Sequence, residues 1–382
     1  MTAAPTLAPA PVPARGVASV GAPTRDRFLD GLRALAIGRV VFYHALGFAW
    51  LAYLFPAMGV MFAIGGSLMA ASLRKGGAVR AVRSRMRRLL PSVWALGAIV
   101  VPLTLWLLWS DDPTALPPVE LLLWVLPVGE PAGDPQLLPA TIVLWYVVTY
   151  LWLVVLSPLL HALFRRWPLP TVVAPLVVLA LTQLVAPGAG VDLDSTFGVA
   201  LVNAATFGTC WVLGFAHRHG TLRRLPVAVW LGLSAVLLAA GTAWAFTHPG
   251  EGGTVDLNEI PLAQGLYSTG FVLLLMRRTP DVAWLRRFRA VDWLVSAVNA
   301  RAVTIYLWHN IALSASEPLA DRLDVWRFGD KPGYALYAAI GVALIVIAVL
   351  AFGWIEDLAA RRRPRLLPTG QSRSATIPEP PR

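Results

Sequence analysis

Apolar stretches as long as a lipid bilayer is thick dominate this sequence. A helix rises about 1.5 Å per residue, so roughly 20 apolar residues cross the ~30 Å hydrocarbon core. Such stretches recur between residues 29 and 355. The chain is 57% hydrophobic and 14% charged, which leaves too little charge to cover the surface of a water-soluble globule. We therefore expect an all-α, polytopic membrane helix bundle in a lipid bilayer.

We expect about ten transmembrane helices in this bundle. Their approximate ranges are 29–50, 54–73, 89–109, 139–164, 170–186, 198–216, 226–246, 260–276, 293–315 and 333–355. The apolar stretch 119–128 is too short to cross a bilayer and is typical of a re-entrant or interfacial segment. No internal repeat is visible, which argues against a transporter built from duplicated halves.

The sign of the charge alternates from loop to loop. Loop 74–88 carries seven basic residues and no acidic one, whereas 110–138 carries five acidic residues and no basic one. Cytoplasmic loops are enriched in Lys and Arg, so loop 74–88 is predicted to be cytoplasmic. An even number of spans then places both termini in the cytoplasm. We expect the protein to be a multi-pass protein of the cytoplasmic membrane. This loop charge also accounts for the net charge of +11 without a nucleic-acid partner.

Three segments differ in composition. Residues 1–27 are rich in Ala and Pro and are predicted to form a disordered cytoplasmic tail, and residues 357–382 a disordered basic tail. Residues 28–356 would form one transmembrane domain. A single cysteine, Cys210, excludes an internal disulfide, and no Cys/His cluster with metal-ligand spacing is present, so no metal is expected.

Two ionisable residues of the first span lie on one helix face. Arg33 and His44 are eleven residues apart, about 20° past three full turns and ~16 Å along the axis. An ionisable group in hydrocarbon is costly, so each indicates function by default. Asp30 and Arg33 would lie at the cytoplasmic mouth and His44 deep in the membrane. There is a structural alternative for each residue. The Arg33 side chain could extend to the membrane interface, and His44 could be a hydrogen-bonded packing residue.

Other polar groups have two interpretations each. Arg85 and Arg88 share one face of the helix entering the third span, and their guanidinium groups suit phosphates, although topology alone also requires basic loops. The ninth span carries further candidates in the run Tyr306-Leu307-Trp308-His309. His309 would shape a pocket or pair with a backbone group. The last candidates, Trp145 and Tyr146, are interface aromatics or substrate contacts.

The chain resembles the acyltransferase family 3 membrane proteins. The run Phe28-Leu29-Asp30-Gly31-Leu32-Arg33, with His44 eleven residues after Arg33, resembles the opening of that family. Four weaker matches follow in order: Phe62-Ala63-Ile64-Gly65-Gly66, Arg85-x-x-Arg88-Leu89-x-Pro91, Leu144-Trp145-Tyr146 and Tyr306-Leu307-Trp308-His309. Gly65 replaces the usual Ser, and Ser84 stands where many members have Arg.

The resemblance implies a membrane O-acyltransferase. It implies that an acyl group, typically acetyl, moves from cytosolic acyl-CoA to a hydroxyl of an extracytoplasmic or membrane-associated glycan or metabolite. Arg85 and Arg88 would hold the phosphates of the donor, acetyl-CoA, and Arg33 would assist. His44 would be the general base or the acyl carrier. The remaining pocket candidates are Asp30, Trp145, Tyr146, Tyr306 and His309. A multi-pass transporter or flippase for an anionic or sugar-linked substrate, and a non-catalytic family member, are the alternatives.

Overall fold

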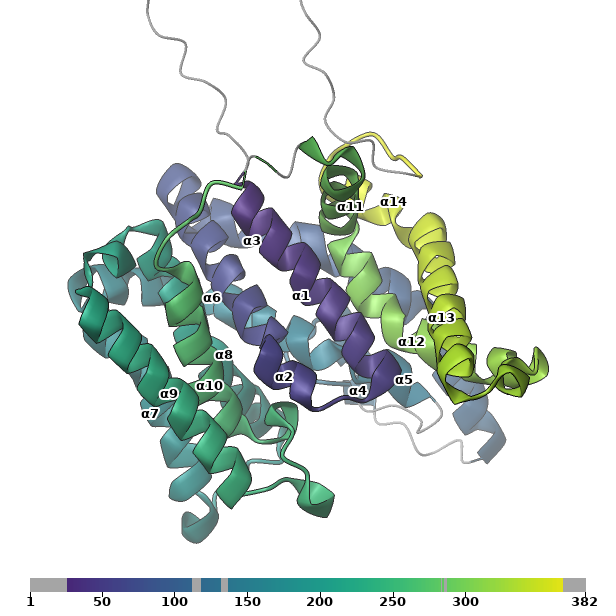
Figure 1. The fold of residues 1–382 in the computed structure, drawn as a ribbon, viewed down its shortest axis with the longest axis horizontal. Helices are drawn as coiled ribbons and strands as arrows, with labels where there is room; N and C mark the ends of the chain where they lie inside the picture. The colour runs from purple at the N-terminus through teal and green to yellow at the C-terminus, as the bar shows by residue number, and fades with distance from the viewer. Residues whose placement is uncertain (1–25, 112–117, 132–136, 283, 285–286, 367–382) are drawn as a thin grey trace, which may run out of the picture.

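Helices make up the regular structure of the described chain. The computed structural model describes residues 26–111, 118–131, 137–282, 284 and 287–366, and these contain no β-strand. The α-helices are α1 (Arg27–Leu46), α2 (Trp50–Leu54), α3 (Ala57–Asp111), α4 (Pro118–Val125), α5 (Leu138–Thr141), α6 (Leu144–Arg166), α7 (Pro168–Leu184), α8 (Thr196–Arg218), α9 (Val227–Thr247), α10 (Pro261–Met276), α11 (Arg289–Ala300), α12 (Ala302–Arg322), α13 (Asp330–Phe352) and α14 (Trp354–Ala359). Figure 1 shows α1 beginning and α14 ending at the same end of the bundle.

Several of these helices are suited to a bilayer. Five helical stretches of the described residues are long and apolar enough to span one: Trp50–Trp106, Leu138–Arg166, Thr196–Arg218, Val227–Thr247 and Asp330–Phe352. Two shorter apolar helices, α7 and α10, accompany them. The prediction of an all-α membrane protein is thus confirmed. The expected short piece at 119–128 corresponds to the eight-residue helix α4.

The predicted spans 54–73 and 89–109 belong to one kinked helix, α3. Its regular geometry is interrupted only at Gly77, whose φ of 73° and ψ of 174° lie in a region that L side chains rarely adopt. Of the seven basic residues expected in a loop, Arg74 and Lys75 lie just before this break, and the other five lie on helical turns after it. A regular helix gives each of them a fixed direction, which a flexible loop would not.

The predicted span 293–315 is wrong as a single helix. It is divided at Arg301, where φ is −120° and ψ is 22°, into α11 and α12. Arg301 is 1% exposed, and its Nη2 is 2.8 Å from Asp357 Oδ2. A buried guanidinium needs such a partner, and this ion pair holds the break at the junction.

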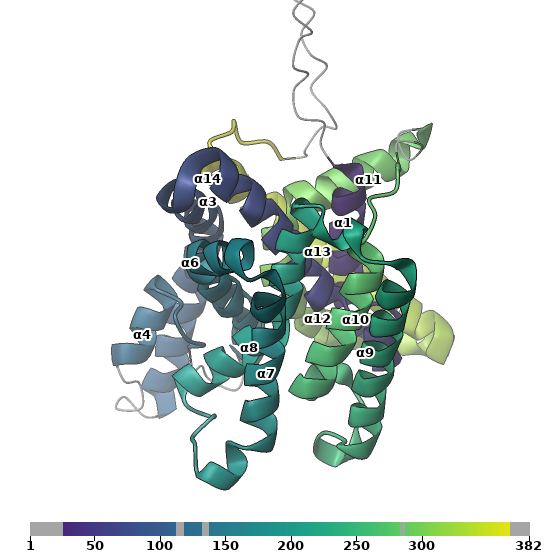
Figure 2. The ribbon, with the colours of Figure 1, turned by 90° about the vertical axis from the view of Figure 1, so that its left-hand side faces the viewer.

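Glycines let the two central helices approach closely. A Cβ on Gly66 would lie 2.0 Å from Trp211 O, and one on Gly214 would lie 2.1 Å from Ala63 O. Small residues permit such contacts between membrane helices. Helix α8 is enclosed along most of its length, whereas α9 and α13 bury few side chains. These two helices lie on opposite sides of the bundle in Figure 1, and Figure 2 shows it from the side of α9.

The folded region extends beyond the predicted 28–356 domain at both ends. Asp26 caps α1 by accepting from the backbone N–H of Phe28, at 3.1 Å, and Arg27 is buried against Asp292. At the other end, α14 continues to Ala359 and the described chain to Leu366. The predicted tail boundaries therefore fall inside structured segments. The expected disorder of 1–25 and 367–382 lies outside the described residues.

Candidate active site

A cavity of about 530 Å³ collects most of the charged residues that the sequence singled out. We call it the basic cavity. Its charged and aromatic lining residues are Asp30 and Arg33 of α1, Arg85 and Arg88 of α3, Tyr146 and Tyr150 of α6, Tyr306 of α12, Glu356 and Asp357 of α14, and Arg362. With Asn299 of α11 included, six helices and the chain after α14 contribute to the lining, so residues from segments far apart in the sequence meet at one place.

Arg85 and Arg88 present their charge to this cavity. Arg85 Nη2 donates to Ser72 Oγ at 3.2 Å. Among the described residues no carboxylate oxygen lies within 4.0 Å of either guanidinium group. Unneutralised guanidinium groups in a partly enclosed space are suited to binding an anion, and above all a phosphate.

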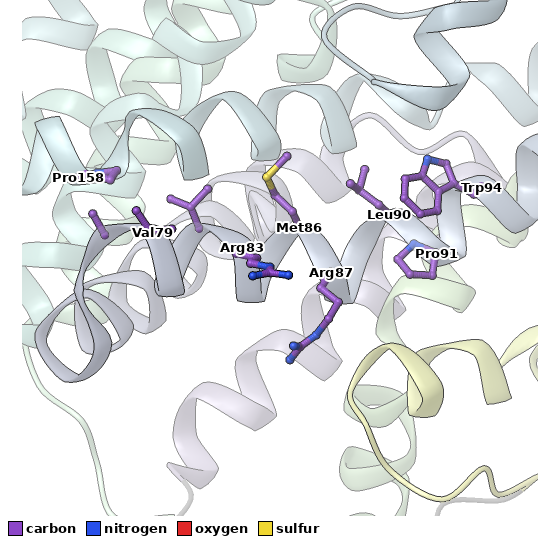
Figure 3. Close-up of a pocket in the computed structure, with 10 residues that line it drawn as sticks. Val79, Arg83, Met86, Arg87, Leu90, Pro91, Trp94 and Pro158 are labelled. Atoms are coloured by element: carbon purple, nitrogen blue, oxygen red, sulfur yellow. The ribbon is translucent and has the colours of Figure 1, made fainter.

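Arg83 and Arg87, on the same helix, do not line the basic cavity. They border a second, mainly apolar hollow of about 640 Å³, which we call the outer groove. Figure 3 shows both guanidinium groups on one side of the helix, with Met86 and Leu90 on the other. The helix therefore divides the basic segment by face, as its i, i+3 and i, i+4 spacings predicted.

Asp30 belongs partly to a structural cluster. Its Oδ2 is 3.7 Å from Arg27 Nη1, and Arg27 Nη2 is 2.7 Å from Asp292 Oδ1. The Asp30 carbonyl accepts a 2.7 Å hydrogen bond from Asn299 Nδ2, and Asn299 also lines the cavity. These contacts join α1 to α11 and fix the edge of the basic cavity where Arg33 emerges.

Aromatic rings line another part of the cavity. The ring centroids of Tyr146 and Tyr306 are 4.8 Å apart, and Tyr306 Oη donates to Val143 O at 3.0 Å. Tyr150, one turn after Tyr146, also lines the cavity. Trp145, in contrast, is not among the lining residues; its ring stacks on Phe207, with centroids 5.5 Å apart, and it is partly buried against the core. The i, i+4 spacing from Tyr146 was the available signal for Tyr150.

His44 and His309 form a pair behind Tyr306. His309 Nε2 is 3.3 Å from His44 Nδ1, with ring centroids 4.9 Å apart. The Tyr306 and His309 ring centroids are 5.6 Å apart. A chain of ring contacts therefore runs from the wall of the basic cavity to His44. The sequence placed each histidine in a helix but gave no sign that they meet.

Backbone carbonyls set the tautomers of this histidine pair. His309 Nδ1 is 2.6 Å from Tyr306 O, and His44 Nδ1 is 2.9 Å from Val40 O. A carbonyl only accepts, so each Nδ1 carries the proton. His44 Nδ1–H is then shared between Val40 O and His309 Nε2. The lone pair of His44 Nε2 is left for another partner.

His44 lies nearer the end of its helix than the expectation of a deeply placed ring implied. It is in the last turn of α1, which ends at Leu46 with Gly47 in the left-handed conformation, φ 67°. His44 is exposed, whereas His309 is 0% exposed. His309 is thus the enclosed member of the pair and His44 the accessible one.

Arg39, unassigned from the sequence, has partners of its own near His44. Its Nε donates to Leu51 O at 3.2 Å, and its guanidinium carbon lies 4.8 Å from the Tyr43 ring centroid. Tyr43 Oη donates to Asp256 Oδ2 at 2.6 Å. These contacts tie the end of α1 to the segment before α10 and hold the turn that carries His44.

A family model for an acyltransferase domain, acyltransferase family 3, matches residues 26–354. The chain belongs to this family. It is an acyltransferase, and the helical, apolar fold makes it a membrane protein. No curated protein and no solved structure matches it.

This acyltransferase has glycine where the resemblance led us to expect serine. A Cβ on Gly65 would lie 2.7 Å from Trp211 Cζ3 and 3.2 Å from Tyr150 Cε2. Trp211 is fixed in turn, because its Nε1 donates to Ser157 Oγ at 2.9 Å. The departure therefore has a packing reason: the indole occupies the space that a side chain at position 65 would need.

Besides Tyr150, four polar or charged lining residues had no role assigned from the sequence: Asn299, Glu356, Asp357 and Arg362. Glu356 and Asp357 stood at a predicted domain boundary, and Arg362 in a predicted tail. The packing of α14 beside α3 and α12 brings Glu356, Asp357 and Arg362 to the cavity, whereas Asn299 reaches it from α11. No group of three or more His, Cys, Asp or Glu residues suited to a metal occurs within the described parts of the chain.

Proposed function

We propose that this acyltransferase moves an acyl group, typically acetyl, from cytosolic acyl-CoA to a hydroxyl of an extracytoplasmic or membrane-associated glycan or metabolite. The observation that carries the proposal is the continuity between the basic cavity and the histidine pair. One end suits a polyanionic donor. The other end presents an accessible imidazole nitrogen with its lone pair available.

The basic cavity would bind the donor. Coenzyme A carries several phosphate groups, and Arg85 and Arg88 lack a described carboxylate within 4.0 Å. Arg33, on α1 in the same cavity, would add a third charge. The predicted cytoplasmic location of the basic segment agrees with a cytosolic donor. The thioester would then extend along the tyrosine-lined wall toward Tyr306 and the histidine pair.

His44 would act as a general base. Its Nε2 would take the proton from the acceptor hydroxyl as the oxygen attacks the thioester carbonyl, forming the new C–O bond. Collapse of the tetrahedral intermediate breaks the C–S bond, and the CoA thiolate leaves with the proton returned from the imidazolium. An acyl-histidine intermediate on the same nitrogen is the second route, in which transfer occurs in two steps.

His309 would serve as a positioning residue. By accepting from His44 Nδ1–H it keeps the His44 ring in the tautomer whose Nε2 is unprotonated. Its own Nδ1–H is held by Tyr306 O, which places the orientation of His309 under the control of a cavity residue. The exposed side of His44 would receive the acceptor, away from the basic cavity.

The test uses the full chain in lipid nanodiscs with radiolabelled acetyl-CoA and a cell-envelope glycan fraction. Wild-type protein is expected to release CoA thiol and to label the acceptor. His44→Ala should abolish the labelling while thermal unfolding and CoA binding persist. His248→Ala is the matched control, because His248 is an exposed histidine stacked on Trp244 and lies outside the site.

Three results would count against the proposal. Labelling by His44→Ala at the wild-type rate would remove His44 from the mechanism. Failure of the wild-type protein to consume any acyl-CoA, with every acceptor fraction, would indicate a non-catalytic member. Flux of an anionic solute into proteoliposomes without acyl-CoA consumption would indicate a transporter. Acid-quenched label that remains on the protein at position 44 would instead select the two-step route.

A further inference from the structure

The chain that follows α14 is folded back to the basic cavity by a defined turn. Arg361 adopts a left-handed conformation, φ 57°. The Arg362 N–H donates to Asp357 O at 2.7 Å, and the Arg361 N–H to Leu358 O at 2.9 Å. This pair of bonds is the Schellman arrangement that ends helices, here with arginine at the position that glycine usually occupies. The turn fixes where residue 362 lies.

A buried ion pair holds this segment at both ends. Arg301 Nη2 donates to Asp357 Oδ2 at 2.8 Å and also to the carbonyl of Arg365. The Arg365 N–H donates back to Asp357 Oδ2 at 3.2 Å. Burial acts to raise the pKa of Asp357, but the hydrogen bond and charge of Arg301 outweigh it and hold that pKa below its usual value. The Asp357 carboxylate is therefore ionised at neutral pH.

Glu356 anchors the same helix to α12. Its Oε1 accepts from the Thr304 N–H at 2.8 Å and from Thr304 Oγ1 at 2.6 Å. Burial raises the pKa of Glu356. Together with the Arg301 ion pair, this contact attaches α14 and residues 360–365 to the junction of α11 and α12, and Figure 1 shows α14 near α11. Residues of α11, α12 and α14 line the cavity at this junction.

Only one of three consecutive arginines reaches the cavity. All three side chains are exposed, but Arg362 lines the cavity together with Arg33, Arg85 and Arg88, whereas Arg361 and Arg363 are not among its lining residues. No described carboxylate oxygen lies within 4.0 Å of the Arg362 guanidinium. Four guanidinium groups thus surround one space. Asp30, Glu356 and Asp357 line the same space, but Asp357 is paired with Arg301 and Glu356 is bonded to Thr304, so a bound polyanion would relieve the repulsion among the guanidinium groups.

We infer that Arg362 is a phosphate-binding residue for the acyl-CoA donor and that Ala360 and Arg362 form part of the wall of the donor site, in a segment held in place by Arg301 and Asp357. This inference rests on the proposed function. Arg362, from the segment after α14, would contact the donor in addition to Arg85 and Arg88 of α3. Bidentate binding by guanidinium groups from separate helices would orient the donor as well as hold it.

The three consecutive arginines supply their own controls. Arg362→Gln should raise the KM for acetyl-CoA, and the dissociation constant of CoA, by about tenfold, with kcat within about threefold of wild type. Arg363→Gln removes the same charge outside the cavity and should leave both constants within about twofold. Arg361→Gly also removes one charge, preserves the turn, and should behave like Arg363→Gln.

Equal KM values for Arg362→Gln and Arg363→Gln would overturn the inference. If Arg362→Gln lowers the thermal unfolding temperature, Arg362→Lys keeps the test decisive, because it retains the charge without the bidentate geometry: an intermediate KM supports binding, and a wild-type KM contradicts it. The two claims fail in different ways. If the wild-type protein neither binds CoA nor turns over acyl-CoA, the proposed function is refuted. If the wild-type protein turns over acyl-CoA and Arg362→Gln behaves like it, only the inference about Arg362 is refuted.

Discussion

The two ends of the site differ in the kind of polar group they contain. The basic cavity has four guanidinium groups and no described carboxylate within 4.0 Å of Arg85, Arg88 or Arg362. The histidine pair has two imidazoles whose Nδ1 atoms are hydrogen-bonded to backbone carbonyls. Permanent charge suits binding, whereas a neutral ring with an available lone pair suits proton transfer. The comparison indicates that binding and chemistry are separated along the bundle.

The sharpest test of this separation is a double-mutant cycle on the histidine pair. His44→Ala should lower kcat about 10³-fold, and His309→Ala about 10–100-fold, with the donor KM unchanged in both. Because His309 acts through His44, the double variant should be no slower than His44→Ala alone. His309→Gln, whose amide oxygen can accept from His44 Nδ1–H, should recover part of the rate.

Steady-state kinetics with acetyl-CoA, together with thermal unfolding of each variant, check this cycle. If His309→Ala lowers kcat by the same factor in the His44→Ala background as in the wild-type protein, the two rings act independently. A rise in donor KM for His309→Ala would place this residue in binding and break the comparison.

The second test exchanges arginines on the two faces of α3. Arg85→Gln and Arg88→Gln should each raise the donor KM by about 10–100-fold with little change in kcat, since each removes a charge-assisted contact. Arg83→Gln and Arg87→Gln remove the same charge on the side of the outer groove. These two should leave the donor KM within about twofold (Figure 3).

Isothermal titration with CoA, at two salt concentrations, separates a specific contact from a general effect of net charge. All four variants should lose some salt dependence if only long-range attraction matters. Equal losses of affinity on both faces would show that α3 does not orient a bound donor, and the division of the helix into two faces would have no functional meaning.

A third test concerns the ion pair that positions the end of the basic cavity. Asp357→Asn should lower the free energy of unfolding by about 1–3 kcal/mol at pH 7, because a buried guanidinium loses its charged partner. The pKa of Asp357 is depressed in the folded protein, so its contribution is present above the unfolded pKa of about 3.9 and is lost as the pH falls through the lower folded value.

Thermal unfolding between pH 8 and pH 3 measures this contribution. The difference between wild type and Asp357→Asn should be constant from pH 8 to about pH 5 and should shrink only below about pH 4. A difference that disappears near neutral pH would mean that Asp357 is protonated there and that the Arg301 contact is not an ion pair.

The smallest effect is expected where the cavity wall changes without any change of charge. Gly65→Ser places a side chain 2.7 Å from Trp211 and should cost about 1–3 kcal/mol of stability through overpacking. Gly232→Ser, in α9, has no atom within 4 Å of the new Cβ and should cost under about 0.5 kcal/mol. Calorimetric unfolding compares the two. Equal stabilities would show that the Trp211 ring moves freely, and the packing account of Gly65 would be wrong.

A site residue could be predicted from the sequence when the property that marks it is local in the sequence, and not when it depends on contacts between distant segments. Arg33 and Arg85 were identified because helix periodicity and the cost of charge in hydrocarbon are local properties of a sequence. Trp145 and Tyr146 had the same two interpretations because aromatic residues with different surroundings look alike in sequence, and only Tyr146 is among the residues that line the basic cavity. Arg362 was missed because a basic, proline-containing segment is typical of disorder, and only contacts with Arg301 and Asp357, 56 residues apart in sequence, hold it in place.

The sequence by itself determined that this chain forms an all-α membrane protein, because the length and apolarity of its helices leave few other ways to satisfy the backbone. It also determined the family, through motifs that lie within single helices. Only the tertiary structure decided which polar groups come together: His44 beside His309, and Arg362 in the same cavity as Arg88. These residues come from segments far apart in the chain, and their positions depend on how glycine contacts and buried ion pairs set the helices against one another.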